Sequence, residues 1–139
     1  MIKTSNIERW FRLLLSLIIT SSVLAGCQRA SKQGQTDQAP DVSIALSVEP
    51  SPPAVGKAQV VVELADATGK PIEGATVDVR GDMSHAGMQP VMAAATGAGG
   101  SYSADFEWTM AGDWVVTVTA ALPDGRTATR QFDLTVQKP

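Results

Sequence analysis

The chain has 139 residues, a length typical of one folded domain, and its 11 Lys and Arg against 14 Asp and Glu give a formal net charge of −3. Its basic residues form no cluster, so we expect no nucleic acid as a partner. A single cysteine and a single histidine exclude a disulfide within the chain and leave too few ligands for a structural zinc site.

Residues 1–26 are predicted to be a cleaved export signal. A basic segment that ends at Arg12 precedes an uncharged stretch of apolar or small residues from Leu13 to Gly26, which is the layout of a secretory signal peptide. A helix needs about 20 apolar residues to span a bilayer, so this shorter stretch makes a permanent transmembrane helix the weaker alternative.

The export signal ends in Leu24-Ala25-Gly26-Cys27, which resembles the bacterial lipobox, whose cysteine is lipidated and becomes the first mature residue. A free thiol is the alternative, but an unpaired cysteine is unusual in an exported protein. We therefore expect an exported lipoprotein, anchored by its lipid to the extracytoplasmic face of a membrane. Residues 27–40 supply the lipidated cysteine and a polar, glutamine-rich tether that is predicted to be flexible.

Residues 41–139 are predicted to form one all-β domain, because apolar and polar side chains alternate between segments rich in turn residues. The predicted inward faces are Val42–Val48, Val60–Leu64, Ala75–Val79, Tyr102–Trp108, Trp114–Ala120 and Phe132–Val136, with a further strand near Val91–Ala95. No segment repeats apolar residues at helical spacing. We predict an immunoglobulin-like sandwich of two sheets with six or seven strands, in which Trp108 and Trp114 belong to the core.

The sequence does not favour an enzyme. After lipidation the domain has no free thiol, and its one histidine is His85. Gly97, Gly99 and Gly100 are explained by a hairpin, since no helix follows them as it would in a phosphate-binding loop. The scattered acidic residues are explained by solvated strand positions. A hydrolase is therefore the least favoured class.

One segment carries candidate metal ligands: Met83, His85 and Met88 lie within six residues. Thioether sulfur and imidazole suit Cu(I), whereas Mg²⁺ and Ca²⁺ prefer oxygen. If the preceding strand stays extended through His85, Met83 and His85 share a face, and Gly87 permits a turn that returns Met88 toward them. Trp108, Met110 and Trp114 are available as apolar cover. In the alternative interpretation the methionines fill gaps in the core and His85 is a surface residue.

Two segments resemble the FixH/YtkA-like domain: Gly100-x-Tyr102 with its strand to Trp108, and Ala111-Gly112-Asp113-Trp114-Val115-Val116-Thr117-Val118. Pro71-Ile72-x-Gly74-Ala75-x-Val77, followed by a loop with Met and His, extends the resemblance to roughly residues 41–137. The resemblance implies an extracytoplasmic immunoglobulin-like fold. Members of the family occur near copper export, copper resistance and cytochrome oxidase assembly, which implies function by association only.

Two functions follow as hypotheses. The first is a non-enzymatic lipoprotein that binds or relays copper, as Cu(I), through Met83, His85 and Met88, with a protein partner in copper handling. The second is an interaction module without a metal, which contacts an envelope assembly or transport complex.

Overall fold

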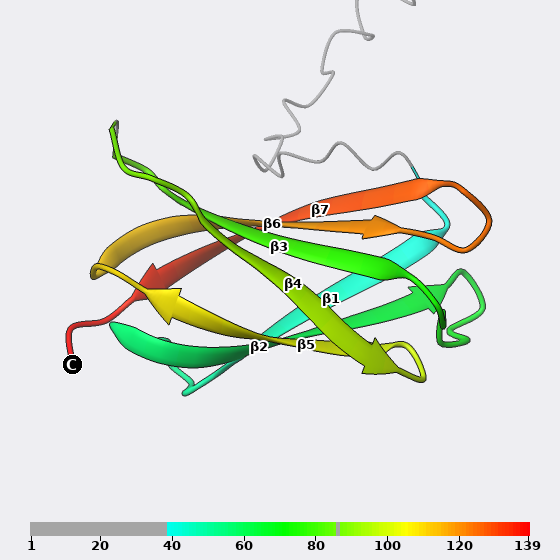
Figure 1. The fold of residues 1–139 in the computed structure, drawn as a ribbon, viewed down its shortest axis with the longest axis horizontal. Helices are drawn as coiled ribbons and strands as arrows, with labels where there is room; N and C mark the ends of the chain where they lie inside the picture. Colours follow the sequence, from blue (N-terminus) through cyan, green and yellow to red (C-terminus); the bar gives the residue numbers. More distant parts are fainter. Residues whose placement is uncertain (1–38, 86) are drawn as a thin grey trace, which may run out of the picture. The chain divides into compact units, whose positions relative to one another are not determined.

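The computed structural model describes residues 39–85 and 87–139, and these form an all-β domain (Figure 1). Its strands are β1 (Val42–Glu49), β2 (Gly56–Asp66), β3 (Thr76–Met83), β4 (Val91–Ala98), β5 (Ser101–Trp108), β6 (Gly112–Ala121) and β7 (Thr127–Val136). The described part of the chain contains no helix that could cross a membrane. The predicted export signal, Cys27 and nearly all of the predicted tether lie outside the described residues.

All seven strands form one antiparallel hydrogen-bonded order, β1-β2-β5-β4-β3-β6-β7. The prediction of an all-β domain with up to seven strands is confirmed, and the segment near Val91–Ala95 is β4. The strand order corresponds to that of immunoglobulin constant-type domains, in which the first, second, fifth and fourth strands face the third, sixth and seventh.

The predicted separation into two sheets needs a correction, because β4 joins the two layers. Its first part pairs with β3, from Gly81↔Val91 to Val77↔Ala95. Its last part pairs with β5, from Thr96↔Ser103 to Ala98↔Ser101. The sheet curls until its outer strands approach each other, where Arg130 Nη1 donates to the carbonyl oxygen of Ile44 at 2.9 Å. The result is a nearly closed sheet.

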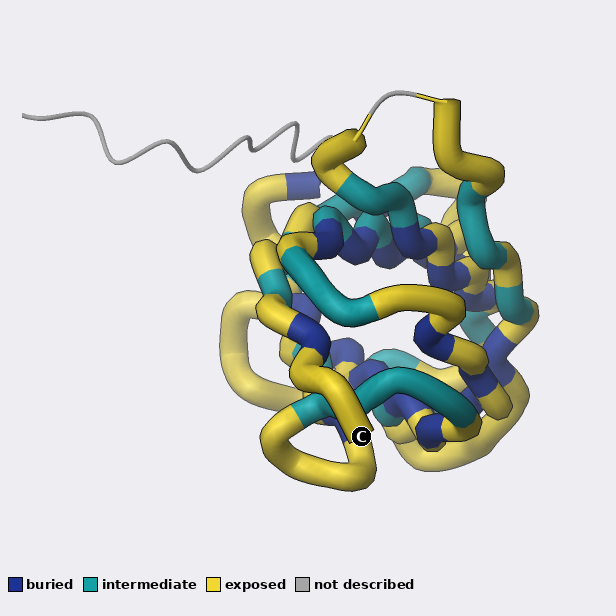
Figure 2. The backbone as a smooth tube through the Cα atoms, turned by 90° about the vertical axis from the view of Figure 1, so that its left-hand side faces the viewer, coloured by how far each residue is buried: buried dark blue, intermediate teal, exposed yellow. Residues whose placement is uncertain are grey.

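The core lies between the two layers and is lined by the predicted inward faces (Figure 2). Alternate residues of β5, from Tyr102 to Trp108, and of β6, from Trp114 to Ala120, are buried. Trp108 and Trp114 are 0% and 1% exposed and meet edge to face, with ring centroids 5.2 Å apart. Burying each large apolar side chain stabilises the fold by roughly 1.5–3 kcal/mol, so the core holds without a disulfide.

Two turns that contain glycine lie at the end of the domain opposite to Met83, His85 and Met88, and the first of them was predicted as a hairpin. Gly99 and Gly100 connect β4 to β5 with positive φ angles of 63° and 79°. A side chain at Gly100 would lie 2.9 Å from the carbonyl oxygen of Leu64, so only glycine fits there. The β6–β7 turn contains Asp124-Gly125, a dipeptide typical of hairpin turns.

The buried Tyr102 ties the β2–β3 connection to β5. Its hydroxyl donates to the carbonyl oxygen of Ile72 at 3.0 Å and accepts from the backbone N–H of Ala75 at 3.1 Å. Two backbone groups of an irregular segment thus find partners inside the domain.

Candidate metal site at the β3–β4 end

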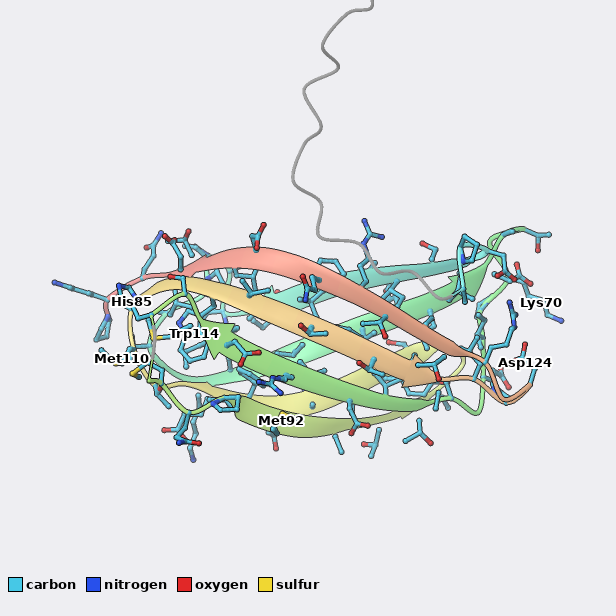
Figure 3. All side chains as sticks on the ribbon, turned by 90° about the horizontal axis from the view of Figure 1, so that it is seen from above. Lys70, His85, Met92, Met110, Trp114 and Asp124 are labelled. Atoms are coloured by element: carbon cyan, nitrogen blue, oxygen red, sulfur yellow. The ribbon has the colours of Figure 1, made fainter. Side chains whose placement is uncertain are left out.

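The candidate ligands lie at the end of the domain where β3 passes into β4. The β5–β6 turn, residues 109–111, reaches the same end (Figure 1). Figure 3 places His85, Met110 and Trp114 there, and Lys70 and Asp124 at the opposite end. The two loops lie at the same end of the domain but point apart (Figure 1).

Met83 is the last residue of β3 and is half-buried against the core. It stands opposite Trp114 in the register of β3 and β6. Its Cε lies 3.2 Å from the position that a Cβ would take at Gly112. The side chain of Met83 thus packs closely on the start of β6, as the core-filling interpretation expected, while part of it stays accessible.

His85 and Met88 lie beyond the strand and are exposed, Met88 by 39%. The backbone N–H of Ser84 still donates to the carbonyl oxygen of Asp113 at 3.2 Å. β3 nevertheless ends at Met83, and the chain bends at Ser84 and His85. The extended strand that would aim Met83 and His85 the same way therefore stops before His85, and that expectation is wrong.

The turn expected at Gly87 is present, since this glycine has a φ of 88°. It brings the chain back toward β4 and places Met88 on the returning arm of the loop. Met83, His85 and Met88 are thus gathered on one loop and its base, at one end of the domain.

Met110 differs from its expected role as apolar cover. It lies on the β5–β6 turn and is 48% exposed, while its carbonyl oxygen accepts a hydrogen bond from the indole Nε1 of Trp114 at 3.0 Å. Trp108 and Trp114 are turned into the core, so neither presents a ring face to an ion at the surface. The sheet brings the turn with Met110 to the same end of the domain as the β3–β4 loop, which its place in the sequence could not show.

The carboxylate that precedes Met83 in the chain is already paired. Asp82 accepts two hydrogen bonds from the guanidinium of Arg80, at 2.7 and 2.8 Å, and this contact lowers the pKa of the Asp82 carboxyl. Across residues 39–85 and 87–139, no three His, Cys, Asp or Glu side chains cluster to hold a metal ion. The donors available here are therefore thioether sulfur and the imidazole of His85.

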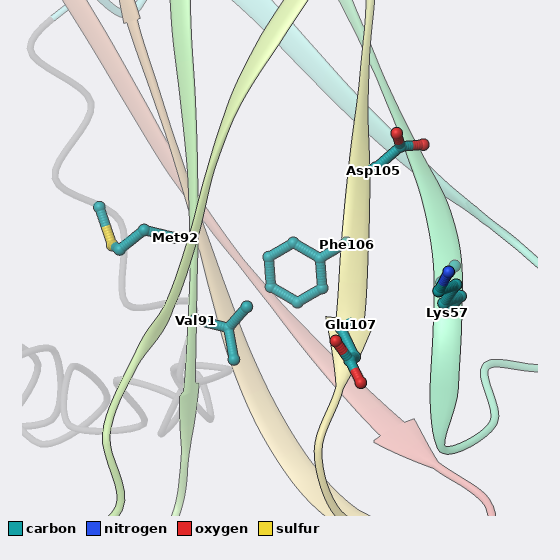
Figure 4. Close-up of a pocket in the computed structure, with 7 residues that line it drawn as sticks. Lys57, Val91, Met92, Asp105, Phe106 and Glu107 are labelled. Carbon is teal, nitrogen blue, oxygen red and sulfur yellow. The ribbon is translucent and has the colours of Figure 1, made fainter.

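A second surface feature is a groove of about 400 Å³ between β4 and β5 (Figure 4). It opens because the first part of β4 pairs with β3 and separates from β5. Val91 and Phe106 lie between the two strands, whereas Met92 points away from them. The groove is also lined by three charged residues, Lys57, Asp105 and Glu107.

Comparison with known proteins places this all-β domain in a family. Residues 36–119, more than half of the chain, match the family model described as YtkA-like. The chain belongs to the YtkA-like family. A comparison with curated proteins gave no match.

Two solved structures resemble the domain in fold. The soluble domain of PmoD from Methylocystis sp. (Rockwell) is 16% identical, with a TM-score of 0.45, and the alignment covers 67% of this chain and 90% of that one. Murine CRIg is 14% identical, with a TM-score of 0.40, and the alignment covers 70% of this chain and 98% of that one.

Proposed function

We propose that this protein is an exported, lipid-anchored YtkA-like domain that binds or relays Cu(I) without catalysing a reaction. The observation that carries the proposal is the position of its soft donors. His85 and Met88 are exposed on the loop whose base holds the half-buried Met83. Thioether sulfur and imidazole select Cu(I) over the harder ions Mg²⁺ and Ca²⁺.

The exposure of these donors favours a relay over a permanent structural site. A structural metal is usually enclosed by protein ligands, whereas an ion on an open loop can pass to ligands of a second protein. Met83, packed on Gly112, would hold one sulfur in place. His85 and Met88 would then be the ligands that a partner in copper handling can reach.

The anchor is proposed from the sequence. A lipid on Cys27 followed by a polar tether would keep the domain on the extracytoplasmic face of a membrane. There it would be close to membrane proteins that export copper or take part in the assembly of cytochrome oxidase. The lack of a thiol beyond Cys27 and the single histidine favour a binding role over a catalytic one.

The deciding experiment is a competition titration between a soluble form without the export signal and Cys27, residues 28–139, and a chromogenic Cu(I) chelator under reducing conditions. The matched variant carries Met83→Leu, His85→Ala and Met88→Leu, since leucine keeps the volume of methionine and removes the sulfur. Wild type should withdraw Cu(I) from the chelator and the variant should not. Equal competition by the two would overturn the proposal.

The groove between β4 and β5 favours the second candidate, an interaction module without a metal. It has an apolar floor of Val91 and Phe106 and a charged rim, the composition of a small protein-binding surface. This candidate takes the lead if wild type fails to compete for Cu(I).

A further inference from the structure

We infer that the groove between β4 and β5 binds an extended segment of another protein, which adds a strand to the sheet and carries a basic side chain opposite Asp105. The inference gives the second candidate function a partner of defined chemistry. It does not depend on Cu(I) binding, because Met83, His85 and Met88 do not line the groove.

The two strands that border the groove each leave one backbone edge without a partner. β5 pairs with β2 along its whole length, but on its other side only Ser101–Ser103 pair with β4. Val91–Ala95 of β4 pair with β3 alone. Within residues 39–85 and 87–139, Ala104–Trp108 and Val91–Ala95 therefore face each other without a ladder of hydrogen bonds. Such unpaired edges are templates for an added strand.

These edges border one continuous hollow. The groove of about 400 Å³ is continued by a second hollow of about 510 Å³, which reaches Thr96 and Ser103, where the two strands begin to pair. Met92 and Asp105 line both parts. Figure 4 shows β4 and β5 separated around the ring of Phe106. A segment of about five residues matches the free stretch of each strand, and strands of that length are common.

The floor of the groove is apolar and is held by the core. Phe106 is 4% exposed, and the centroid of its ring lies 4.8 Å from that of Trp108. Its Cζ is 2.8 Å from the position that a Cβ would take at Gly81, so the ring packs on β3 only because residue 81 has no side chain. Val91, on the inward parity of β4, stays half-buried. An apolar side chain from an added strand would complete its burial.

The charges at the groove indicate which partner fits. Glu107 has Lys57 as its register partner on β2, whereas Asp105 stands opposite the neutral Gln59. Asp105 is exposed and forms no ion pair with any residue that the structure describes. In a strand added beside β5, a Lys or Arg opposite Asp105 would form a favourable cross-strand pair.

A second copy of this chain suits the groove less well. Pairing two copies edge to edge through β5 would bring Asp105 and Glu107 of one copy against the same acidic residues of the other. Like charges at opposed strand positions are destabilising, and charge on a strand edge hinders self-association. The groove therefore favours a foreign segment with a basic residue.

The test uses the soluble form, residues 28–139, without copper, and two short labelled peptides, one of alternating Lys and Val and one of alternating Glu and Val. Fluorescence anisotropy measures binding, and hydrogen exchange reports the backbone amides of Ala104–Trp108 and Val91–Ala95. The lysine peptide should bind and slow exchange at alternate amides of these edges, because every second residue of a strand faces the same neighbour. The glutamate peptide should not bind.

A charge reversal at the groove should exchange the two peptides. Asp105→Lys should weaken binding of the lysine peptide about tenfold or more and let the glutamate peptide bind, because repulsion replaces attraction. Asp133→Lys is the matched control, since Asp133 is an exposed acid on β7 and its reversal changes the net charge equally. This control should bind the lysine peptide like wild type. A lysine peptide with every backbone nitrogen methylated keeps its charge but has no N–H donors, and it should not bind.

Three results would overturn the inference. Equal binding of the methylated peptide, or equal weakening by Asp105→Lys and Asp133→Lys, would indicate attraction between charges without strand addition. Slow exchange of the edge amides in the free protein would mean that the chain itself, or a second copy if dilution removes the protection, fills the groove. Failure of the lysine peptide to bind wild type would end the inference and leave the proposed Cu(I) function standing, because the chelator titration tests that function separately.

Discussion

The indole Nε1 of Trp114 donates a hydrogen bond to the carbonyl oxygen of Met110, at a distance of 3.0 Å. One partner is 1% exposed and the other 48%, so this contact ties the tip of the β5–β6 turn to the core. Trp114 also stands opposite Met83, at the base of the β3–β4 loop. The stability of the core and the shape of the candidate site therefore depend on the same residue.

Replacing Trp114 should be among the most destabilising changes in the domain. Trp114→Ala removes a buried indole that packs on Trp108, and we expect it to lower the free energy of unfolding by about 3–5 kcal/mol. Urea denaturation measures the loss. Met110→Leu is the matched control, because it keeps the backbone carbonyl and should change stability by less than about 0.5 kcal/mol. A loss below about 1 kcal/mol for Trp114→Ala would contradict the core assignment.

Tyr102→Phe tests the link between β5 and the β2–β3 connection. The substitution keeps the ring but leaves the Ile72 carbonyl and the Ala75 N–H without their partner. An unsatisfied buried polar group costs about 1–3 kcal/mol, so we expect a loss of that size. Faster hydrogen exchange at Ala75 would accompany it. An unchanged exchange rate would show that water replaces the hydroxyl.

Asp66 should contribute to stability above its ordinary pKa of 3.8 and lose that contribution in acid. The Thr68 hydroxyl and the backbone N–H groups of Lys70 and Thr68 donate to its carboxylate and lower its pKa in the folded state. Since the unfolded state binds the proton more readily, stability falls as pH drops through the lowered pKa.

Thermal unfolding of wild type and Asp66→Asn over the range from about pH 5 to pH 2 checks this expectation. Asp41 and Asp124 titrate in the same range, because Arg126 lowers the pKa of both. The difference between the two proteins therefore isolates Asp66. It should shrink as the pH falls, and a difference that stays constant would count against the role of the ionised carboxylate.

Cu(I) binding should weaken on acidification, because protonated imidazole cannot bind a metal. His85→Ala should bind Cu(I) less tightly and lose this dependence on pH, since thioether sulfur, unlike imidazole, takes up no proton on acidification. Chelator competition at several pH values distinguishes the two proteins. The same acid dependence in His85→Ala would exclude the imidazole as a ligand.

Lipidation predicts a defined mature N-terminus. In wild type, mass spectrometry should find Cys27 as the first residue with acyl chains attached, and Cys27→Ser should release the domain or leave it unprocessed. An unmodified Cys27 that is still preceded by Gly26 would refute the anchor.

The sequence alone was enough to predict the strands and their inward faces. Alternation is a local property, so Tyr102–Trp108 and Trp114–Ala120 show in their own residues which side chains turn to the core. The turns at Gly99-Gly100 and Asp124-Gly125 are local in the same way, because their conformations depend on the residues that occupy them.

Strand partners were decided only by the tertiary structure. Pairing joins segments far apart in the chain, and the short side chains of Ala93–Ala95 in β4 carry no signal that distinguishes β3 from β5 as a neighbour. Met83, His85 and Met88 could be found because they are neighbours in sequence. Met110 comes to the same end of the domain only through the register of β3 with β6, since that pairing sets the start of β6 opposite Met83.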